Sequence, residues 1–432
     1  MKKVLIIAYS FPPVGGAGVQ RPVKFVKYLQ KFGWEPVVLT VSNPSVPLID
    51  TTLPKDIPEG VQIYRALTFE PSYKVKHAFA DNQGKRSGAK VFLKRCISML
   101  LLPDLQVLWW PGLIFKLFKV IINEKPLCLF VTAPPFSSFI PVITLGKLFG
   151  IPVVLDFRDE WEFSRNSWEN SSKTQLASCL DVFLEKYALT NCSAFTTATQ
   201  GYIDSMTNHY GPTLKVKGVV ITNGYDVDDF NVTEIKGRAI EDSNRVTIVY
   251  AGTVMKATSL NIFCQILKRL LEQDEKNYQK VRLKVFGRVV GDEQTCLEDE
   301  TLKGVIECHG YVEHEKVAEE LLNADFLLLT LSDLPGAEKI INGKTFEYMA
   351  SGRHIFALIP EGEMSALISS NYDNATVVSP KNLDVACQAL INVLDNIEEV
   401  KKRQGRDISC FLRENLTERL ASVFDRIVND NS

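Results

Sequence analysis

Short runs rich in valine, isoleucine and leucine alternate with longer amphipathic stretches along most of the chain, and this alternation limits the fold more than any other feature. Short apolar runs bounded by turn residues are typical of buried strands, and apolar residues spaced three and four apart are typical of helices. Strands and helices that alternate in this way build parallel sheets covered on both faces. We therefore predict an α/β fold, with strands near residues 4–9, 36–40, 128–132, 153–157, 194–197, 246–250, 281–286, 305–308 and 326–330.

The alternation is interrupted near residues 225–243, and the second set of strands begins at residue 246. A single hydrophobic core stops growing near roughly 250 to 300 residues, and this chain has 432. We predict a first domain over residues 1–230, a second over 231–410, and a C-terminal helix over 411–432 that packs back toward the first domain. Two doubly wound domains would bind ligands at the carboxyl ends of their strands.

Charge and cysteine content exclude several classes of protein. The 49 lysines and arginines are balanced by 51 aspartates and glutamates, a net charge of -2, so we expect no nucleic-acid partner. The nine cysteines are scattered and the five histidines have no H-x-x-x-H spacing, which indicates neither a metal site nor a disulfide framework. The first apolar run is too short for a secretory signal, which favours the cytoplasm.

A glycine-rich segment, residues 12–21, follows the first predicted strand and precedes the first predicted helix. Gly15 and Gly16 let the backbone approach a ligand closely, and the helix that follows offers free amide groups to an anion. The segment is only part of a dinucleotide fingerprint, because the third glycine and the later acidic residue are missing, so a nicotinamide cofactor is disfavoured. The alternative is a glycine turn that serves chain geometry alone.

Five segments along the chain resemble, in order and spacing, those of the family 4 glycosyltransferases, which have the GT-B architecture. They are Tyr9-Ser-Phe-Pro-Pro-Val-Gly-Gly, Asp156-Phe-Arg-Asp-Glu-Trp, Ile221-Thr-Asn-Gly-Tyr-Asp, Tyr250-Ala-Gly-Thr and Gly343-Lys-Thr-Phe-Glu-Tyr-Met-Ala-Ser-Gly. The resemblance covers nearly the whole chain and implies two Rossmann-like domains facing each other across a cleft. It also implies transfer of a sugar, with retention of configuration, from a nucleotide-sugar donor to a glycan or lipid-linked acceptor, without a cofactor. Relatives with the Asp-Phe-Arg-Asp segment commonly build bacterial surface polysaccharides.

The resemblance places the donor in the second domain. Members of the family carry two glutamates separated by seven residues, and Glu347 matches the second, which holds the ribose hydroxyls. The first position is Lys339 in this chain, with Glu338 one residue outside the register. Either Glu338 substitutes through a shifted loop, or Lys339 and the backbone around Gly336 hold the sugar. The alternative for each of these side chains is a solvated surface residue.

The diphosphate of the donor requires cations or amide groups, because the leaving nucleotide gains negative charge. Lys256, which follows Gly252, resembles the lysine of the family, whereas Thr253 stands where an arginine is common. Arg288 and Lys344 are alternative cations. Each of these residues alone is more often a surface side chain than a phosphate ligand.

Two aspartate-containing motifs remain. Arg158 and Asp159 follow a predicted strand and are expected either to orient the acceptor hydroxyl or to form a structural salt bridge. Asp226 and Asp228 form a D-x-D pattern that binds a metal in the other glycosyltransferase architecture. They follow an Asn-Gly turn here, so we interpret them as linker residues and expect no metal.

The segment 85–115 begins with five basic residues, Lys85, Arg86, Lys90, Lys94 and Arg95, and ends in an uncharged run of 11 residues over 105–115. That run is too short to span a bilayer. Basic residues beside aromatic residues and leucines can hold a protein on the inner face of an anionic membrane, with partial insertion of Trp109, Trp110 or Leu100 to Leu102. The alternative is a surface loop followed by a core helix.

Three functions stay open from the sequence. The first is a retaining glycosyltransferase. The second is an epimerase or hydrolase of the same fold that acts on a nucleotide sugar. The third is a non-catalytic relative that binds a nucleotide sugar, because Lys339 and Thr253 replace two residues typical of the family.

Overall fold

The computed structural model describes residues 1–46, 48–50, 53–73, 102–161, 175–230, 245–403 and 406–431. The chain divides into two compact units. Unit 1 consists of Met1–Thr222 and Arg413–Ser432, and unit 2 consists of Asn223–Leu412. The predicted basic residues between 85 and 95 lie outside the described residues.

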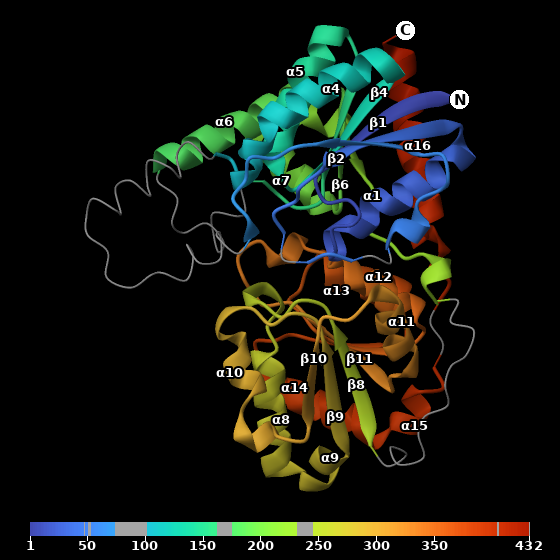
Figure 1. Cartoon of the computed structure of the whole chain (residues 1–432). Helices are drawn as coiled ribbons and strands as arrows, with labels where there is room; N and C mark the ends of the chain where they lie inside the picture. Colours follow the sequence, from blue (N-terminus) through green and yellow to red (C-terminus); the bar gives the residue numbers. More distant parts are fainter. Residues whose placement is uncertain are drawn as a thin grey trace. The chain divides into compact units, whose positions relative to one another are not determined.

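Unit 1 is built on a sheet of seven parallel strands in the order β3-β2-β1-β4-β5-β6-β7 (Figure 1). The order reverses between β1 and β4, as in doubly wound folds. The strands are β1 (Lys2–Ala8), β2 (Trp34–Val41), β3 (Gln62–Ala66), β4 (Cys128–Ala133), β5 (Val153–Phe157), β6 (Ala194–Thr197) and β7 (Gly218–Val220).

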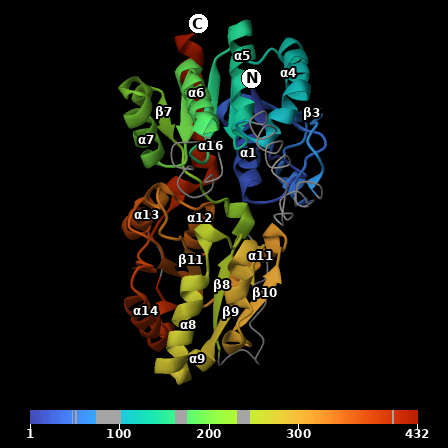
Figure 2. The ribbon, with the colours of Figure 1, turned by 90° about the vertical axis from the view of Figure 1, so that its left-hand side faces the viewer.

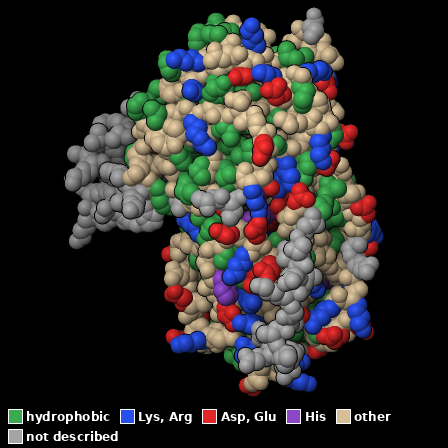
Figure 3. All heavy atoms as spheres, turned by 45° about the vertical axis from the view of Figure 1, so that its right-hand side comes forward, with side chains coloured by type: hydrophobic (Ala, Val, Ile, Leu, Met, Phe, Trp, Pro, Cys, Tyr) green, Lys and Arg blue, Asp and Glu red, His purple; other side chains and the backbone are tan. Residues whose placement is uncertain are grey.

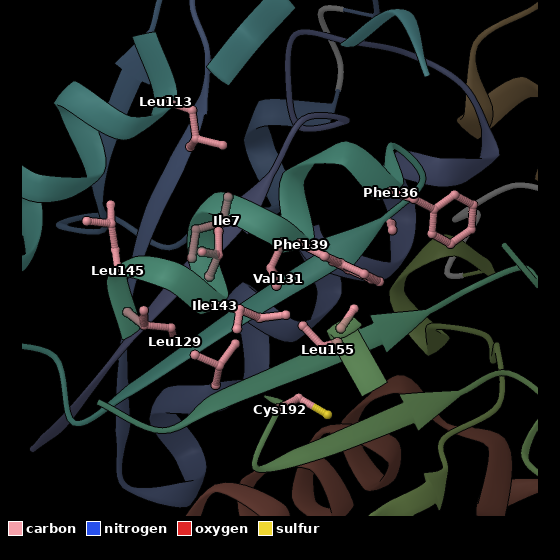
Figure 4. Packing of buried hydrophobic residues seen from close by; sticks show 14 of the residues in the cluster. Ile7, Leu113, Leu129, Val131, Phe136, Phe139, Ile143, Leu145, Leu155 and Cys192 are labelled. Atoms are coloured by element: carbon pink, nitrogen blue, oxygen red, sulfur yellow. The ribbon is translucent and has the colours of Figure 1, made fainter. Parts of the chain in front are cut away.

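Helices cover both faces of this sheet because successive strand residues point to opposite sides. Leu5 and Ile7 of β1 pack in one cluster with α4, α5, α6 and α7, and Val4 and Ile6 pack in another with α1 and α16 (Figure 2). Figure 4 shows the first cluster around Phe139. The helices are α1 (Ala17–Tyr28), α4 (Trp110–Glu124), α5 (Phe139–Phe149), α6 (Gln175–Asn191), α7 (Gln200–Tyr210) and α16 (Arg413–Asp430).

Unit 2 repeats the plan with six parallel strands in the order β10-β9-β8-β11-β12-β13. The strands are β8 (Val246–Ala251), β9 (Val281–Phe286), β10 (Ile306–Gly310), β11 (Phe326–Thr330), β12 (His354–Leu358) and β13 (Ala375–Val378). Helices α8 and α14 cover one face, and α11, α12 and α13 cover the other. The helices are α8 (Asn261–Gln273), α9 (Glu275–Lys280), α10 (Gln294–Leu297), α11 (His314–Asn323), α12 (Gly343–Ala350), α13 (Glu363–Asn371), α14 (Leu383–Asp395) and α15 (Ile397–Val400).

The division between the units falls at Thr222, eight residues before the predicted boundary at residue 230. The physical reason is backbone pairing. Tyr225 forms a bridge with Leu412, and its amide donates to the carbonyl of Phe411 at 3.1 Å. The segment after Thr222 is therefore held by unit 2.

Candidate functional site

The strand order of unit 2 changes direction between β8 and β11, which hydrogen-bond side by side. Ligands of open α/β sheets bind at this point, beyond the carboxyl ends of the strands. The loop after β8 carries Lys256 and the loop after β11 carries Ser332. The two loops are joined, because Ser332 Oγ donates to the carbonyl of Lys256 at 2.7 Å and its amide donates to the carbonyl of Ala257 at 2.8 Å.

Two glycines bring the chain together at this edge of the sheet. Gly252 and Gly287 have φ angles of 132° and 139°, which side chains rarely allow. A Cβ at Gly287 would lie 2.1 Å from the carbonyl oxygen of Gly252, and a Cβ at Gly252 would lie 2.9 Å from Nζ of Lys344. The ends of β8 and β9 therefore approach each other and Lys344 only because both positions lack side chains.

Lys344 lies in the first turn of α12 and points over the end of β8. Its Nζ is 3.8 Å from the centroid of the Tyr250 ring, and this atom is buried without a hydrogen-bond partner among the described residues. The ring attracts the ammonium, but a buried charge without a hydrogen-bond partner is unfavourable. Free amides at a helix N-terminus and an adjacent cation together form a site for an anion. The arrangement can bind a phosphate or diphosphate.

The rest of α12 is fixed to the same strand. The hydroxyl of Tyr348 accepts a hydrogen bond from the amide of Ala251 at 2.8 Å. Burial raises the pKa of Tyr348 well above its ordinary value, so this hydroxyl stays protonated. Glu347 is half-buried and follows Lys344 by three residues, a spacing that places both side chains on one face of a helix. The predicted cation and the predicted carboxylate therefore lie on the same face of α12.

The other predicted donor residues lie in the loops around this edge. Lys256 and Glu338 are exposed, and Lys339 and Arg288 are half-buried. Gly336 adopts a φ of 87° and begins the short 3-10 helix Ala337–Lys339. Their roles in binding stay predictions.

In unit 1, the guanidinium of Arg158 binds backbone carbonyls and not Asp159. It donates to the carbonyls of Ala133 at 3.0 Å and Pro134 at 2.6 Å, and also to that of Gly18. Among the residues that the structure describes, Arg158 and Asp159 form no salt bridge, and Asp159 is exposed. Arg158 therefore ties the loops after β4 and β5 to the start of α1. Its predicted role toward an acceptor is untested.

Asp156, the first residue of the same motif, is fully buried at the end of β5. It accepts hydrogen bonds from Arg21 at 2.7 and 3.0 Å, from Thr132 at 2.8 Å and from Thr196 at 2.7 Å. Burial would raise the pKa of Asp156, but the charge and hydrogen bonds of Arg21, with those of the two threonines, hold it below its ordinary value. These contacts make Asp156 a structural residue of unit 1.

The predicted glycine segment is also in unit 1, whereas the other predicted donor residues are in unit 2. Gly16 has a φ of 101° and immediately precedes α1. A Cβ at Gly15 would lie 3.0 Å from Cγ of Leu48, and the Gly15 amide donates to the carbonyl of Leu48 at 3.1 Å. The positive φ of Gly16 favours glycine for the turn itself, and a side chain at Gly15 would require Leu48 to shift. Binding of a donor by Gly15 and Gly16 stays a prediction.

Three residues at this edge of the sheet were not among the predicted site residues: Tyr250, Gly287 and Tyr348. Position was the available signal for two of them, because Tyr250 ends the predicted strand 246–250 and Gly287 directly follows the predicted strand 281–286. In the described part of the chain, no group of three His, Cys, Asp or Glu residues is placed to hold a metal ion. Asp226 instead accepts the amide of Asp228 at 3.1 Å, which closes a local turn.

No family model and no curated protein matches the chain. Solved structures are similar over its whole length. Sucrose-phosphate synthase from Thermosynechococcus elongatus aligns over 100% of this chain and 97% of its own, with a TM-score of 0.62 and 11% identity. HepE from Anabaena in complex with UDP-glucose aligns over 100% and 99%, with a TM-score of 0.62 and 11% identity. UDP-GlcNAc 2-epimerase from Methanocaldococcus jannaschii aligns over 99% and 100%, with a TM-score of 0.54 and 11% identity.

These comparisons define the architecture. The GT-B fold consists of two Rossmann-like units. In each unit of this chain the order of the parallel strands reverses beside the first strand, β1 or β8. The predicted fold class is confirmed.

Proposed function

We propose that the protein is a retaining glycosyltransferase that moves a sugar from a nucleotide-sugar donor to a glycan or lipid-linked acceptor. The observation that carries the proposal is Lys344, whose buried Nζ has no hydrogen-bond partner among the described residues and lies at the N-terminus of α12. A donor diphosphate would supply the missing negative charge. The resemblance to polysaccharide-building relatives supports a role in bacterial surface polysaccharide biosynthesis.

Each part of the donor has a candidate partner in unit 2. Lys344 and the first amides of α12 neutralise the diphosphate, with Lys256 and Arg288 as further cations. Glu347 accepts hydrogen bonds from the ribose hydroxyls. The loop that contains Gly336, Glu338 and Lys339 follows β11 and is the candidate for the sugar.

The reaction breaks the bond between the anomeric carbon and the diphosphate oxygen and forms a bond from that carbon to the acceptor oxygen. Charge develops on the leaving diphosphate, and a fixed ammonium such as that of Lys344 stabilises it. In a front-face reaction, the leaving phosphate takes the acceptor proton, so a protein nucleophile is not required. Asp159 is the exposed carboxylate that we propose for orienting the acceptor, and Arg158 is the residue that positions the loops beside it.

A second function is favoured by one comparison. The UDP-GlcNAc 2-epimerase matches the chain with a TM-score of 0.54, so the fold also accommodates epimerisation. A third function, binding without turnover, is motivated by Lys339 at the position where the family has its first glutamate.

Isothermal titration of UDP and UDP-glucose into the wild-type chain and Lys344→Gln tests the anion site. The variant should bind the diphosphate about 10- to 100-fold more weakly, because a charge-assisted hydrogen bond contributes about 1.5 to 3 kcal/mol. Lys303→Gln removes the same charge from a side chain in unit 2 that is 79% exposed and should bind as the wild type does. Equal affinities of Lys344→Gln and the wild type for UDP would contradict the proposed anion site at Lys344.

Mass spectrometry of reactions with several nucleotide sugars separates the three functions. A glycosylated product that appears only with an added acceptor identifies transfer. An isomerised or hydrolysed nucleotide sugar without an acceptor identifies the second function, and tight binding without any product identifies the third.

A further inference from the structure

Helix α4 is apolar on two sides. Leu113, Leu117, Val120 and Ile121 are buried in the core of unit 1. On the outer side, four more large apolar residues are 41–63% exposed: Ile114, Phe115, Phe118 and Ile122. A helix on the surface of a soluble unit normally presents polar residues outward, and one that is apolar all round normally has a non-aqueous neighbour.

The segment after β3 extends this exposed area. Leu67 and Phe69 are 63% and 67% exposed. The segment lies directly beside the start of α4, because a Cβ at Gly112 would lie 2.0 Å from the carbonyl oxygen of Leu67 and the Phe69 amide donates to the carbonyl of Leu108 at 3.2 Å. We call the six exposed residues the apolar surface: Leu67, Phe69, Ile114, Phe115, Phe118 and Ile122. An exposed group of this kind marks a contact surface.

The charges beside the apolar surface are positive. Lys119 is exposed and its Nζ lies 4.2 Å from the Phe115 ring, and Lys116 lies one turn earlier on the helix. The acidic residue of α4, Glu124, is already neutralised, because Lys3 donates to it at 2.8 Å and Tyr64 donates at 2.5 Å. Elsewhere the face of the molecule in Figure 3 carries acidic and basic side chains interspersed. The local excess of lysine on α4 matches an anionic partner.

The helical segment Leu105–Glu124 has 20 residues and a mean hydropathy of 1.5, which is long and apolar enough to cross a membrane, and it is the one such segment among the described residues. Its inner side, however, belongs to the core of unit 1. Trp109 is 1% exposed, and its Nε1 donates to the carbonyl of Ala66 at 3.3 Å. Of the residues predicted to insert into a membrane, Trp109 is therefore unsuited to that role. Contact along the outer side of α4 leaves these interactions intact, whereas crossing a bilayer would break them.

We propose that the apolar surface lies on an anionic lipid surface, with Phe115 and Phe118 among the lipid headgroups and Lys119 beside the lipid phosphates. Large apolar side chains next to lysines are the side-chain types that bind in this interfacial region. The contact follows from α4 and its neighbours alone and does not depend on the reaction that unit 2 supports.

Sedimentation of the full chain with vesicles tests the proposal. The wild type should sediment with phosphatidylcholine vesicles that contain phosphatidylglycerol, less with phosphatidylcholine alone, and less as salt is added. Phe115→Gln combined with Phe118→Gln should lower the partition coefficient about tenfold or more. Phe183→Gln on α6 replaces a phenylalanine that is 62% exposed and serves as the matched control.

A second measurement does not depend on loss of binding. A fluorophore attached at Ile122→Cys should shift to shorter wavelength when anionic vesicles are added, and one attached at Val216→Cys, where the native side chain is 81% exposed, should not. Failure of the wild type to bind anionic vesicles at low salt would overturn the proposal, as would an equal loss in the Phe183 control. A dimer in solution that the double variant converts to a monomer would identify a protein interface and also overturn it.

Discussion

The guanidinium of Arg21 and the carboxylate of Asp156 form an ion pair with both side chains buried, at 2.7 Å between Nη2 and Oδ1. Arg21 lies in α1, at the end of the predicted glycine segment, and Asp156 is the last residue but one of β5. The guanidinium also donates to the carbonyl of Thr222 at 2.8 Å, so the pair joins three distant segments of unit 1. Asp156 of the Asp-Phe-Arg-Asp segment is therefore held in the interior of unit 1, whereas Asp159 is exposed.

Asp156→Asn should lower the free energy of unfolding by about 3 to 5 kcal/mol, because the variant leaves the charge of Arg21 buried and without its partner. Asp159→Asn makes the same chemical change at an exposed position and should stay within about 0.5 kcal/mol of the wild type. Urea unfolding of both variants measures the difference. Equal stabilities would contradict the structural role of Asp156.

Gly252→Ala should weaken binding of UDP, because the new Cβ would meet Nζ of Lys344 at 2.9 Å and displace the ammonium. Gly211→Ala provides the control. Its φ of 123° is similar to that of Gly252, but nothing lies within 4 Å of its Cβ position. Both variants pay the backbone strain of about 1 to 2 kcal/mol, and only Gly252→Ala should lose affinity in a titration. An equal effect on both would show that strain and not Lys344 is responsible.

Glu347→Ala should abolish measurable transfer while the fold stays intact, because two ribose hydroxyls would lose their acceptor at a cost of about 2 to 4 kcal/mol. Activity assays and thermal unfolding of the same preparation measure the two effects. Glu300→Ala, at a glutamate whose side chain is 85% exposed, should have wild-type activity. Wild-type activity in Glu347→Ala would contradict the assignment of Glu347 to the ribose of the donor.

Stability should fall in mild acid because of His354 at the start of β12. Its Nδ1 lies 2.9 Å from Oδ1 of Asn374, and burial lowers the pKa of His354 from about 6.5 to about 4. The folded state therefore favours neutral imidazole, and its contribution of about 3 kcal/mol is complete above about pH 6.5 and is lost as the pH falls toward about 4. Unfolding of the wild type and His354→Gln across this window isolates the effect. Parallel pH profiles would contradict it.

Chelation should leave activity unchanged, since we expect Lys344 and helix amides, rather than a divalent ion, to neutralise the diphosphate. Assays with and without EDTA provide the measurement. Loss of activity that manganese restores would instead assign Asp226 and Asp228 to a metal.

Much of the fold follows from the sequence because central parallel strands are continuous apolar runs. The predicted strands at 4–9 and 128–132 correspond to β1 and β4, which are buried on both faces. Strands at the edges gave weaker patterns. β7 has three residues, all of them half-buried, and β3 contains one fully buried residue among five. Burial does not account for every strand, however, because β12 is buried along its whole length and was not predicted, whereas the mostly exposed edge strand β10 was.

The candidate site was predictable in its residue types but not in its contacts. Lys344 was one of several candidate cations. Its neighbours in the sequence do not indicate that its ammonium is buried against Tyr250, because the two residues are far apart in the chain. The contacts of Asp156 and Arg158 were not predictable for the same reason. A charged residue at the end of a strand suggests a functional site, but the sequence does not show whether its side chain faces a ligand or another segment of the chain. The distinction depends on partners that only the folded chain brings together.

Unit 1 is made from two pieces of the chain with all of unit 2 between them. Phe424 of α16 packs against Trp34 and Phe130, with ring centroids 5.4 and 5.6 Å apart, so the face of the first sheet that α1 also covers lacks part of its cover until α16 is translated. Synthesis from the N-terminus normally lets the earliest domain fold first. In this chain every residue of unit 2 is translated before α16. Unit 2 is therefore the first unit whose residues are all available for folding, although unit 1 begins earlier in the sequence.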